Sequence, residues 1–150
     1  MRIGINGYGR IGRVLHRILS RNTGSELVAI NDINPDKNNI AYLANYDSTY
    51  GPLEDKFNIQ DNLLVNSKES IEIFHENSID SIPWRDLGVE LVIDSSGISD
   101  NLLKARNLED VVENVIVTNS PSEDLIDKTV IFGVNHKDIC RDDFLISSSI

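Results

Sequence analysis

The 150-residue sequence is poor in the features that mark several large classes of protein. It has one cysteine, Cys140, so no internal disulfide can form, and a lone thiol is typical of a reducing compartment. No apolar run approaches the roughly 18 residues that a membrane-spanning helix needs. The N-terminus has neither the apolar core nor the small-residue cleavage site of a signal peptide. We therefore expect a cytoplasmic protein that does not span a membrane.

Positive charge is also scarce. Lys and Arg number 14 against 24 Asp and Glu, which gives a formal net charge of −10. This charge repels phosphate backbones at long range, so nucleic acid is not an expected partner, and an anionic ligand would need a local binding device. The three histidines, His16, His75 and His136, lack a spaced cysteine or carboxylate partner, so no metal site is predicted. His16 and His75 are expected at the surface, and His136 is expected to shape a turn.

Short apolar runs alternate with amphipathic stretches along most of the chain. The patterns predict strands at 3–6, 27–31, 91–94, 115–118, 130–132 and 145–147. Helices are predicted at 10–21, from 34–36 onward, and at 100–107; the apolar face of the first helix would hold Ile11, Val14, Leu15, Ile18 and Leu19. Apolar strands that alternate with helices favour a parallel sheet covered on both faces. Segment 46–82 is expected to leave this sheet as a small antiparallel excursion, with short strands at 57–59, 63–65 and 71–74.

The most informative motif follows the first predicted strand. Gly7, Gly9 and Gly12 fit the pattern G-x-G-x-x-G, in which the first glycine allows a tight turn and the second a close approach of backbone to pyrophosphate. The third lets the following helix pack closely on the strand. The free amides at the helix start, around Arg10 and Ile11, would then face the pyrophosphate. The predicted fold is therefore an α/β, Rossmann-type, doubly wound parallel sheet.

An acidic residue stands where this motif requires one. Asp32 lies at the end of the second predicted strand, twenty residues after Gly12, where a carboxylate can accept both adenosine ribose hydroxyls. The same carboxylate would repel a ribose 2′-phosphate, so NAD is favoured over NADP as the cofactor. The alternative is a glycine turn without a ligand, in which Asp32 caps a helix.

Several further motifs, in order along the chain, resemble those of phosphorylating glyceraldehyde-3-phosphate dehydrogenase, in its N-terminal NAD-binding domain. The resemblance runs the whole length of the chain. The motifs that carry it are Asn6 to Arg13, Val28 to Asp32, Tyr46 to Gly51, Ile82-Pro83-Trp84, Asp94 to Gly97, Ser120-Pro121-Ser122 and Gly133 to His136. It implies that backbone at Arg10 and Ile11 binds pyrophosphate and that Asp32 binds the ribose. It also implies that Ser96, Gly97 and Asn119 lie along the cofactor towards the nicotinamide.

The resemblance further implies the chemistry of a longer parent enzyme. In the family a cysteine thiolate attacks an aldehyde sugar phosphate, a histidine acts as base, hydride passes to NAD and inorganic phosphate attacks the thioester. The Ser147 to Ile150 segment corresponds to the four residues before that cysteine, so no catalytic residue is predicted within residues 1–150, a single NAD(P)-binding domain. Cys140 lies among Asp138, Asp142 and Asp143, whose charges oppose thiolate formation, so it is predicted to be structural.

The expected whole is a homotetrameric, two-domain dehydrogenase, whose final helix would return to cover an apolar groove on this domain. The abrupt end after a predicted strand suggests that polypeptide has been removed. Three alternatives remain at this point: an erythrose-4-phosphate dehydrogenase, a non-catalytic nucleotide-binding or regulatory paralogue, and, disfavoured for want of a Tyr-x-x-x-Lys pair, a short-chain reductase. Near the reaction centre the chain departs from the family at Asn119, and near the adenine at Asn77, where an arginine is frequent.

Overall fold

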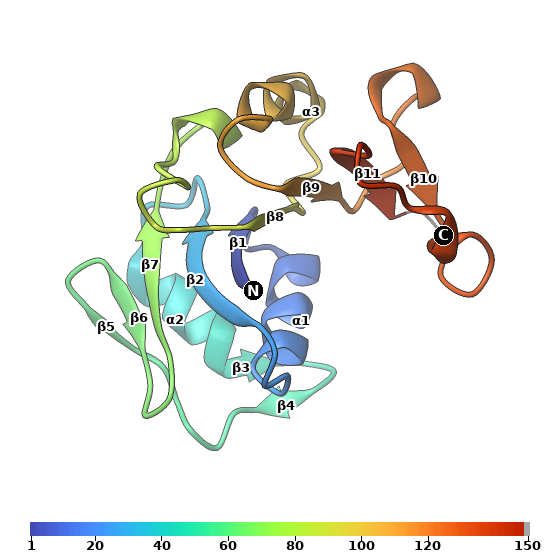
Figure 1. The fold of residues 1–150 in the computed structure, drawn as a ribbon. Coiled ribbons are helices and arrows are strands. Elements are labelled where there is room, and N and C mark those ends of the chain that lie inside the picture. The colour runs from blue at the N-terminus through green and yellow to red at the C-terminus, as the bar shows by residue number, and fades with distance from the viewer. Residues whose placement is uncertain (149–150) are drawn as a thin grey trace.

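The computed structural model describes residues 1–148, and the predictions for Ser149 and Ile150 lie outside them. A nine-stranded sheet forms the centre of the molecule (Figure 1). Its strands are β1 (Arg2–Asn6), β2 (Glu26–Asn31), β5 (Asn58–Gln60), β6 (Leu63–Val65), β7 (Ser70–Phe74), β8 (Leu91–Asp94), β9 (Asn114–Val117), β10 (Lys128–Val130) and β11 (Leu145–Ser148). The predicted α/β architecture is confirmed.

The strand order explains where a ligand site can form. The order is β10-β11-β9-β8-β1-β2-β7-β6-β5, and β1 pairs in parallel with both β2 and β8. The chain therefore runs outward from β1 through β2 to β7, then returns to the other side of β1 at β8. This reversal is the topological switch point, and ligands of open α/β sheets bind outside the carboxyl ends of the strands at such a point.

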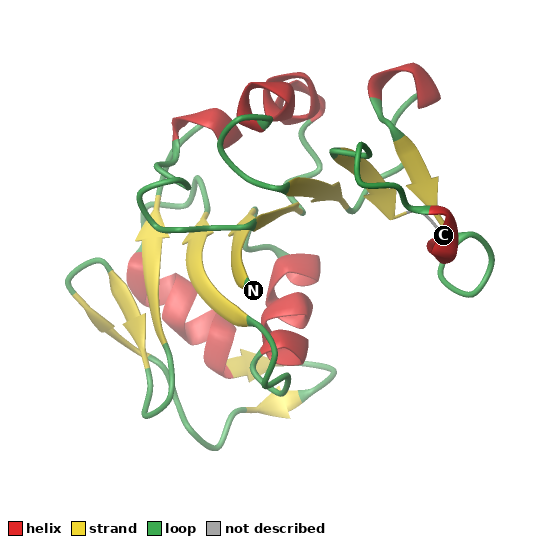
Figure 2. Ribbon diagram, viewed as in Figure 1, coloured by secondary structure: helices red, strands yellow, loops and turns green. Residues whose placement is uncertain are grey.

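Helices cover both faces of the sheet, and each face buries its own apolar core (Figure 2). Helices α1 (Arg10–Leu19) and α2 (Lys37–Asn45) lie on one face, where Ile3, Ile5 and Ile30 meet Ile40 and Ala44. Helix α3 (Ser99–Ala105), with short 3-10 turns at Ile79–Ser81 and Arg106–Leu108, covers the other face, where its Leu102 and Ala105 pack with Trp84 and Val115. Strands buried on both faces account for the near-continuous apolar runs in the sequence.

The side chains that helix α1 buries are not all those that were predicted. Leu15 and Leu19 pack on the core, but Ile11 is 51% and Ile18 58% exposed, so the predicted apolar face is only partly buried. His16, expected at the surface, is 2% exposed. The physical reason is its partner: the ring is held by the buried hydroxyl of Tyr8, so a polar side chain occupies a core-facing position.

The segment from Tyr46 to Ile82 contains the expected antiparallel pairs but is largely part of the main sheet. Strand β7 pairs in parallel with β2 and antiparallel with β6, which pairs antiparallel with β5. A separate two-stranded sheet joins β3 (Tyr46–Asp47) to β4 (Gly51–Pro52). The apolar residues of β7, Ile71 and Ile73, are buried in the core, which draws this strand against β2 and away from an independent unit.

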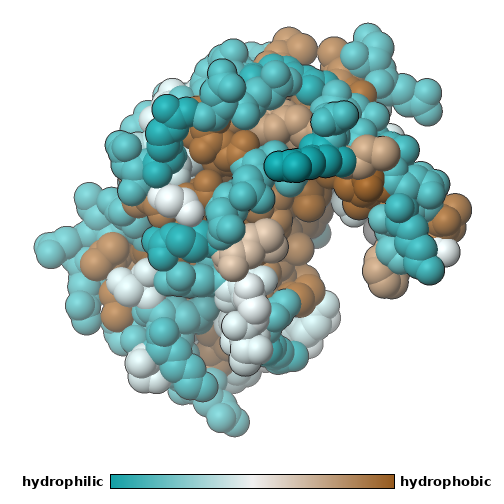
Figure 3. Space-filling view, in the orientation of Figure 1, coloured by the Kyte–Doolittle hydropathy of each residue, from teal (hydrophilic) through white to brown (hydrophobic). Residues whose placement is uncertain are grey.

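The C-terminal third carries β9, β11 and β10, with a 3-10 turn at Glu123–Leu125 and another at His136–Asp138. The strand predicted at 130–132 is instead Lys128–Val130, because the Asn135 side chain bonds both Ile131 N and Thr129 O and closes a turn there. Phe132 and Val134 in this turn are 90% and 77% exposed. Apolar residues also show at the surface on the face drawn in Figure 3. No helix within residues 1–148 is long and apolar enough to cross a membrane.

Candidate functional site

A row of buried polar side chains runs along the carboxyl ends of four adjacent strands. Asn6 ends β1, and its amide nitrogen donates to Asp94 of β8 at 2.9 Å. Its amide oxygen accepts from Asn31 of β2 at 2.7 Å, and Asn31 in turn pairs with the backbone of Glu76 beyond β7. These bonds satisfy the buried amides, which would otherwise be costly, and they align the four strand ends at the switch point.

The glycine motif turns directly above this row. Gly7 has a φ of +89°, and a Cβ there would lie 2.5 Å from the backbone of Ser96. A Cβ at Gly12 would lie 2.3 Å from the carbonyl oxygen of Gly7, so the loop and α1 are in close backbone contact. Gly9 is different, because, apart from Gly9 and its two chain neighbours, no atom of residues 1–148 lies within 4 Å of the Cβ it lacks. The space above Gly9 is open, and a ligand can approach the backbone there.

Helix α1 starts at this open space. Gly9 is its N-cap residue, and within residues 1–148 no side chain caps the helix and no acidic residue occupies its first turn. The first helical bond runs from Arg13 N to Gly9 O at 3.0 Å. The amides of Arg10 and Ile11 precede that bond, at the end of the helix where the macrodipole favours an anion. This arrangement is suited to a pyrophosphate.

Asp32 follows β2 and is held by two backbone amides. One carboxylate oxygen accepts from Tyr8 N and the other from Asn34 N, each at 2.9 Å. The alternative in which Asp32 caps the next helix is wrong: Asp36 caps α2 by accepting from Asn38 N and Asn39 N. Asp32 is thus fixed beside the glycine loop and half-buried.

A common cavity of about 150 Å³ brings the motif and the strand ends together. Of the residues singled out from the sequence, Gly7, Gly9, Asp32 and Ser96 line it. Asn77, the residue that departs from the family pattern near the adenine, lines it as well. The residues present therefore fit a dinucleotide at this edge: open backbone for a pyrophosphate at one point and a fixed carboxylate for a ribose at another.

Gly12, Gly97 and Asn119, which were also predicted, are not among the residues that line this cavity. Ser96 is held by Asn101, whose amide donates to its hydroxyl oxygen at 3.0 Å, and Gly97 follows it with a φ of +69°. Gly12 lies buried behind the loop. Asn119 lies after β9, where its carbonyl accepts from the Ser147 hydroxyl at 2.8 Å.

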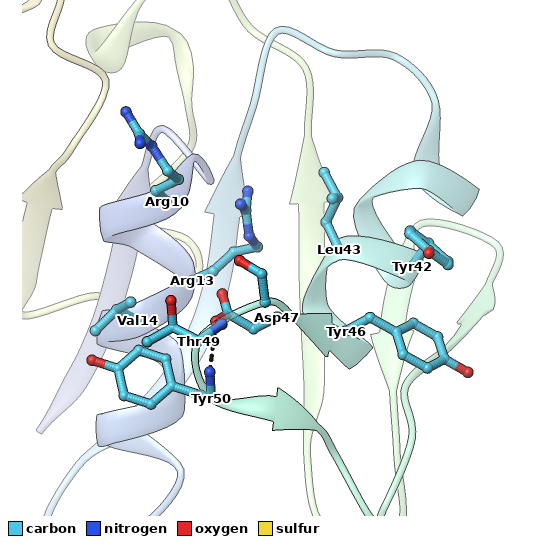
Figure 4. A pocket seen from close by; sticks show the side chains of 10 residues that line it. Arg10, Arg13, Val14, Tyr42, Leu43, Tyr46, Asp47, Thr49 and Tyr50 are labelled. Carbon is cyan, nitrogen blue, oxygen red and sulfur yellow. Dashed lines mark hydrogen bonds between the residues drawn. The ribbon is translucent and has the colours of Figure 1, made fainter.

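A second cavity, of about 520 Å³, lies beside the first turns of α1. The side chains of Arg10 and Arg13 line it on the α1 side, and Tyr42 and Tyr46 project from α2 and β3 (Figure 4). The side chain of Arg10 therefore lines this cavity and not the one at the strand ends, so the predicted role of Arg10 falls to its backbone amide.

The other titratable residues considered from the sequence lie away from both cavities or have local partners. His136 accepts from Gly133 N at 3.0 Å, which confirms that it shapes a turn. His75, expected at the surface, is half-buried, with Nδ1 2.9 Å from the carbonyl oxygen of Asp32. Cys140 is exposed, with its sulfur 3.6 Å from the carbonyl oxygen of Asp138. Within residues 1–148 no cluster of three or more His, Cys, Asp or Glu is placed to hold a metal.

The polar row was not predicted from the sequence. Asn6, Asn31 and Asp94 belong to the longer motifs named above, and each is a polar residue that ends an apolar strand. That position was the available signal, because the carboxyl ends of adjacent parallel strands meet at one edge of a sheet. Burial raises the pKa of the Asp94 carboxyl above its usual value, although bonds from Ser96 and Asn6 oppose the shift.

The fold and this edge of the sheet define a Rossmann-type dinucleotide-binding domain. Comparison with known families agrees: residues 1–102 match the family described as glyceraldehyde 3-phosphate dehydrogenase, NAD binding domain. The chain belongs to this family, and NAD is its cofactor.

Several similar curated proteins are named glyceraldehyde-3-phosphate dehydrogenase. The chain is 38% identical to that of Chlamydia trachomatis serovar L2, over 99% of this chain and 44% of the relative. It is 37% identical to that of Thermotoga maritima, over 97% and 44%, and 34% identical to that of Mycoplasma pneumoniae, over 99% and 44%. The chain thus spans less than half the length of these relatives. The comparisons do not favour the alternatives raised from the sequence.

Proposed function

We propose that residues 1–150 form the cofactor-binding domain of an enzyme that oxidises and phosphorylates an aldehyde sugar phosphate. The observation that carries the proposal is the open backbone at Gly9 beside the fixed carboxylate of Asp32, at the switch point of the sheet. The names of the curated relatives support the reaction class. We further propose that the working enzyme is a homotetramer and that its catalytic cysteine and histidine lie outside these residues.

In this proposal each predicted residue has a separate task. The backbone amides of Arg10 and Ile11 bind the pyrophosphate, and Gly7, Gly9 and Gly12 give the loop the shape that exposes them. Asp32 accepts the hydroxyls of the adenosine ribose. Ser96 and Gly97, with Asn119, extend the site towards the nicotinamide. When bound, NAD supplies the hydride acceptor.

The test is calorimetric titration of the chain with NAD and with NADP, repeated with Asp32→Ala. We expect NAD to bind more tightly than NADP in the unmodified chain, and the variant to lose about 1–3 kcal/mol of NAD binding together with the preference. Asp36→Asn is the matched control, because it removes a nearby charge while asparagine still caps α2. Thermal unfolding of each variant checks the fold. Equal binding of both dinucleotides by the unmodified chain would contradict the assignment of Asp32.

A further inference from the structure

The glycine loop is tied to a buried polar chain on the α1 side of the sheet. The Tyr8 side chain is 3% exposed, and its hydroxyl lies 2.5 Å from Nδ1 of His16, itself 2% exposed. Nε2 of His16 lies 3.7 Å from a carboxylate oxygen of Glu69, just before the apolar core of β7. Glu69 also accepts from the Ser20 hydroxyl at 2.9 Å. We call these three residues the Tyr8–His16–Glu69 chain.

The backbone of Tyr8 meets the proposed cofactor site. Tyr8 N donates to Asp32 at 2.9 Å, and Tyr8 O accepts from the Arg13 guanidinium at 3.0 Å. Tyr8 therefore links Asp32 to the buried side chains: its amide orients the Asp32 carboxylate, and its hydroxyl contacts His16 in the Tyr8–His16–Glu69 chain. A displacement of the Tyr8 ring shifts the amide that holds Asp32, because only Cβ and Cα separate the ring from the amide nitrogen.

We propose that Tyr8 is a positioning residue for the dinucleotide site, anchored by His16 and Glu69 so that its amide holds Asp32 towards the ribose hydroxyls. This inference rests on the function proposed above. It assigns a role to a side chain that does not line the cavity at the strand ends and that the glycine pattern leaves unspecified.

The hydrogen-bond arrangement supports a directed anchor. Burial raises the pKa of the Tyr8 hydroxyl, so it stays protonated and can donate. Nε2 of His16 makes no hydrogen bond within residues 1–148, but the Glu69 carboxylate 3.7 Å away favours the proton on that nitrogen, which leaves Nδ1 free to accept from Tyr8. Burial opposes ionisation of Glu69, but contacts with His16 and with Ser20 and Asn66 lower its pKa below the usual value.

The surroundings explain why this anchor is specific. The His16 ring packs against Phe57, with 5.0 Å between ring centroids, so it has little freedom to turn away. The Tyr8–His16–Glu69 chain borders a cavity of about 440 Å³. The other charged residues that line this cavity are Arg13, Arg17, Arg21, Glu54, Asp55 and Lys68. Buried polar groups cost stability unless they are paired, and an apolar pair of similar shape can be equally stable. Polar side chains here therefore provide orientation more than stability.

The first experiment compares NAD affinity in Tyr8→Phe and in Tyr50→Phe. Tyr50→Phe is the matched control, because it removes a hydroxyl from an exposed tyrosine that lines the same cavity of about 440 Å³. We expect Tyr8→Phe to weaken NAD binding about three- to tenfold, the value of one hydrogen bond, with no change for Tyr50→Phe. Tyr8→Phe/His16→Phe, in which both partners are apolar, should regain thermal stability without regaining affinity.

The decisive measurement places Tyr8→Phe in an Asp32→Ala background, in which the acceptor of the Tyr8 amide is gone. If Tyr8 acts through Asp32, its substitution changes NAD affinity less than about twofold there, because interacting residues are not additive. An equal loss in both backgrounds would overturn the inference and leave Tyr8 with a general structural role.

A measurement without NAD separates this inference from the proposed function. Amide hydrogen exchange at residue 8 should quicken in Tyr8→Phe and not in Tyr50→Phe, since the bond to Asp32 loosens. Unchanged exchange overturns the inference whether or not NAD binds. Failure of the unmodified chain to bind NAD, with exchange altered as expected, counts against the proposed function alone.

Discussion

At the scale of single residues, the site depends on polar side chains that are buried in pairs. Asp94 is 4% exposed and accepts from Asn6 at 2.9 Å and from Ser96 N at 3.1 Å. Each bond adds little net stability, but a donor left without its acceptor costs considerably more. The same carboxylate therefore orients the end of β1 and the loop that carries Ser96.

Asp94→Ala and Asp94→Asn should differ in stability at neutral pH. Alanine leaves two buried donors unpaired and should cost about 2–3 kcal/mol, whereas asparagine keeps an acceptor oxygen and removes a buried charge, so it should cost less. Since burial raises the folded-state pKa of Asp94, ionisation opposes folding as pH rises from the unfolded towards the folded pKa. The stability of Asp94→Asn should thus increase relative to that of the unmodified chain as pH rises from acidic to neutral. Urea unfolding at both pH values measures this, and equal losses for the two variants would contradict it.

At the scale of elements, one ion pair joins the end of α3 to the C-terminal strands. Arg106 contacts Asp127 at 2.8 and 2.9 Å, and Asp127 also accepts from Phe144 N and Leu145 N. The bond from Arg106, with those backbone amides, lowers the pKa of Asp127 although partial burial opposes this. The interaction ties the start of β11 to the residue before β10 and to the end of α3.

Asp127→Asn should weaken the acid dependence of stability. A carboxyl whose folded pKa is lowered stabilises the fold above its unfolded pKa, and this contribution disappears as pH falls through the folded pKa. We expect Asp127→Asn to be less stable than the unmodified chain by about 1–2 kcal/mol near neutral pH, and salt should reduce this difference. In strong acid the two proteins should be equally stable. Asp124→Asn, in the same segment, is the control. Urea unfolding at several pH values measures the difference in stability between Asp127→Asn and the unmodified chain. A difference of the same size at every pH would show that the ion pair is not its source.

At the scale of the whole molecule, the C-terminal turn exposes apolar surface. Phe132 and Val134 are 90% and 77% exposed, and Ile131 and Ile139 nearby are 44% and 45% exposed. Exposed apolar side chains favour association when they gather into a patch. The net charge of −10 opposes it through mutual repulsion, which salt screens.

We expect the chain to self-associate as its concentration and the salt concentration rise, and Phe132→Ser/Val134→Ser to associate several-fold more weakly. Sedimentation velocity over a concentration series measures both effects. Ile18→Ser removes an equally apolar exposed residue from α1 and is the control for the location of the surface. A monomer at all concentrations, or an equal effect of the control, would contradict the expectation.

Much of the molecule could be predicted from local pattern. The glycine spacing, the apolar strands and Asp32 located β1, α1 and β2 to within a few residues, because turn geometry and burial on both faces constrain residue type at each position. Long-range pairing was harder to predict. Ile71 to Phe74 shows a strand pattern, but whether it pairs with β2 in parallel depends on residues forty positions away.

The amino-acid pattern was thus sufficient to establish the fold class, the glycine loop and the acidic residue beside it, since each is encoded within about thirty consecutive residues. Tertiary contacts settled the burial of His16, the exposure of Ile11 and Ile18, and the bonding of Asn6, Asn31 and Asp94 across the sheet. Helical periodicity says which side chains share a face, but not which neighbour that face meets. A buried polar residue is stable only when a partner from another element arrives to satisfy it.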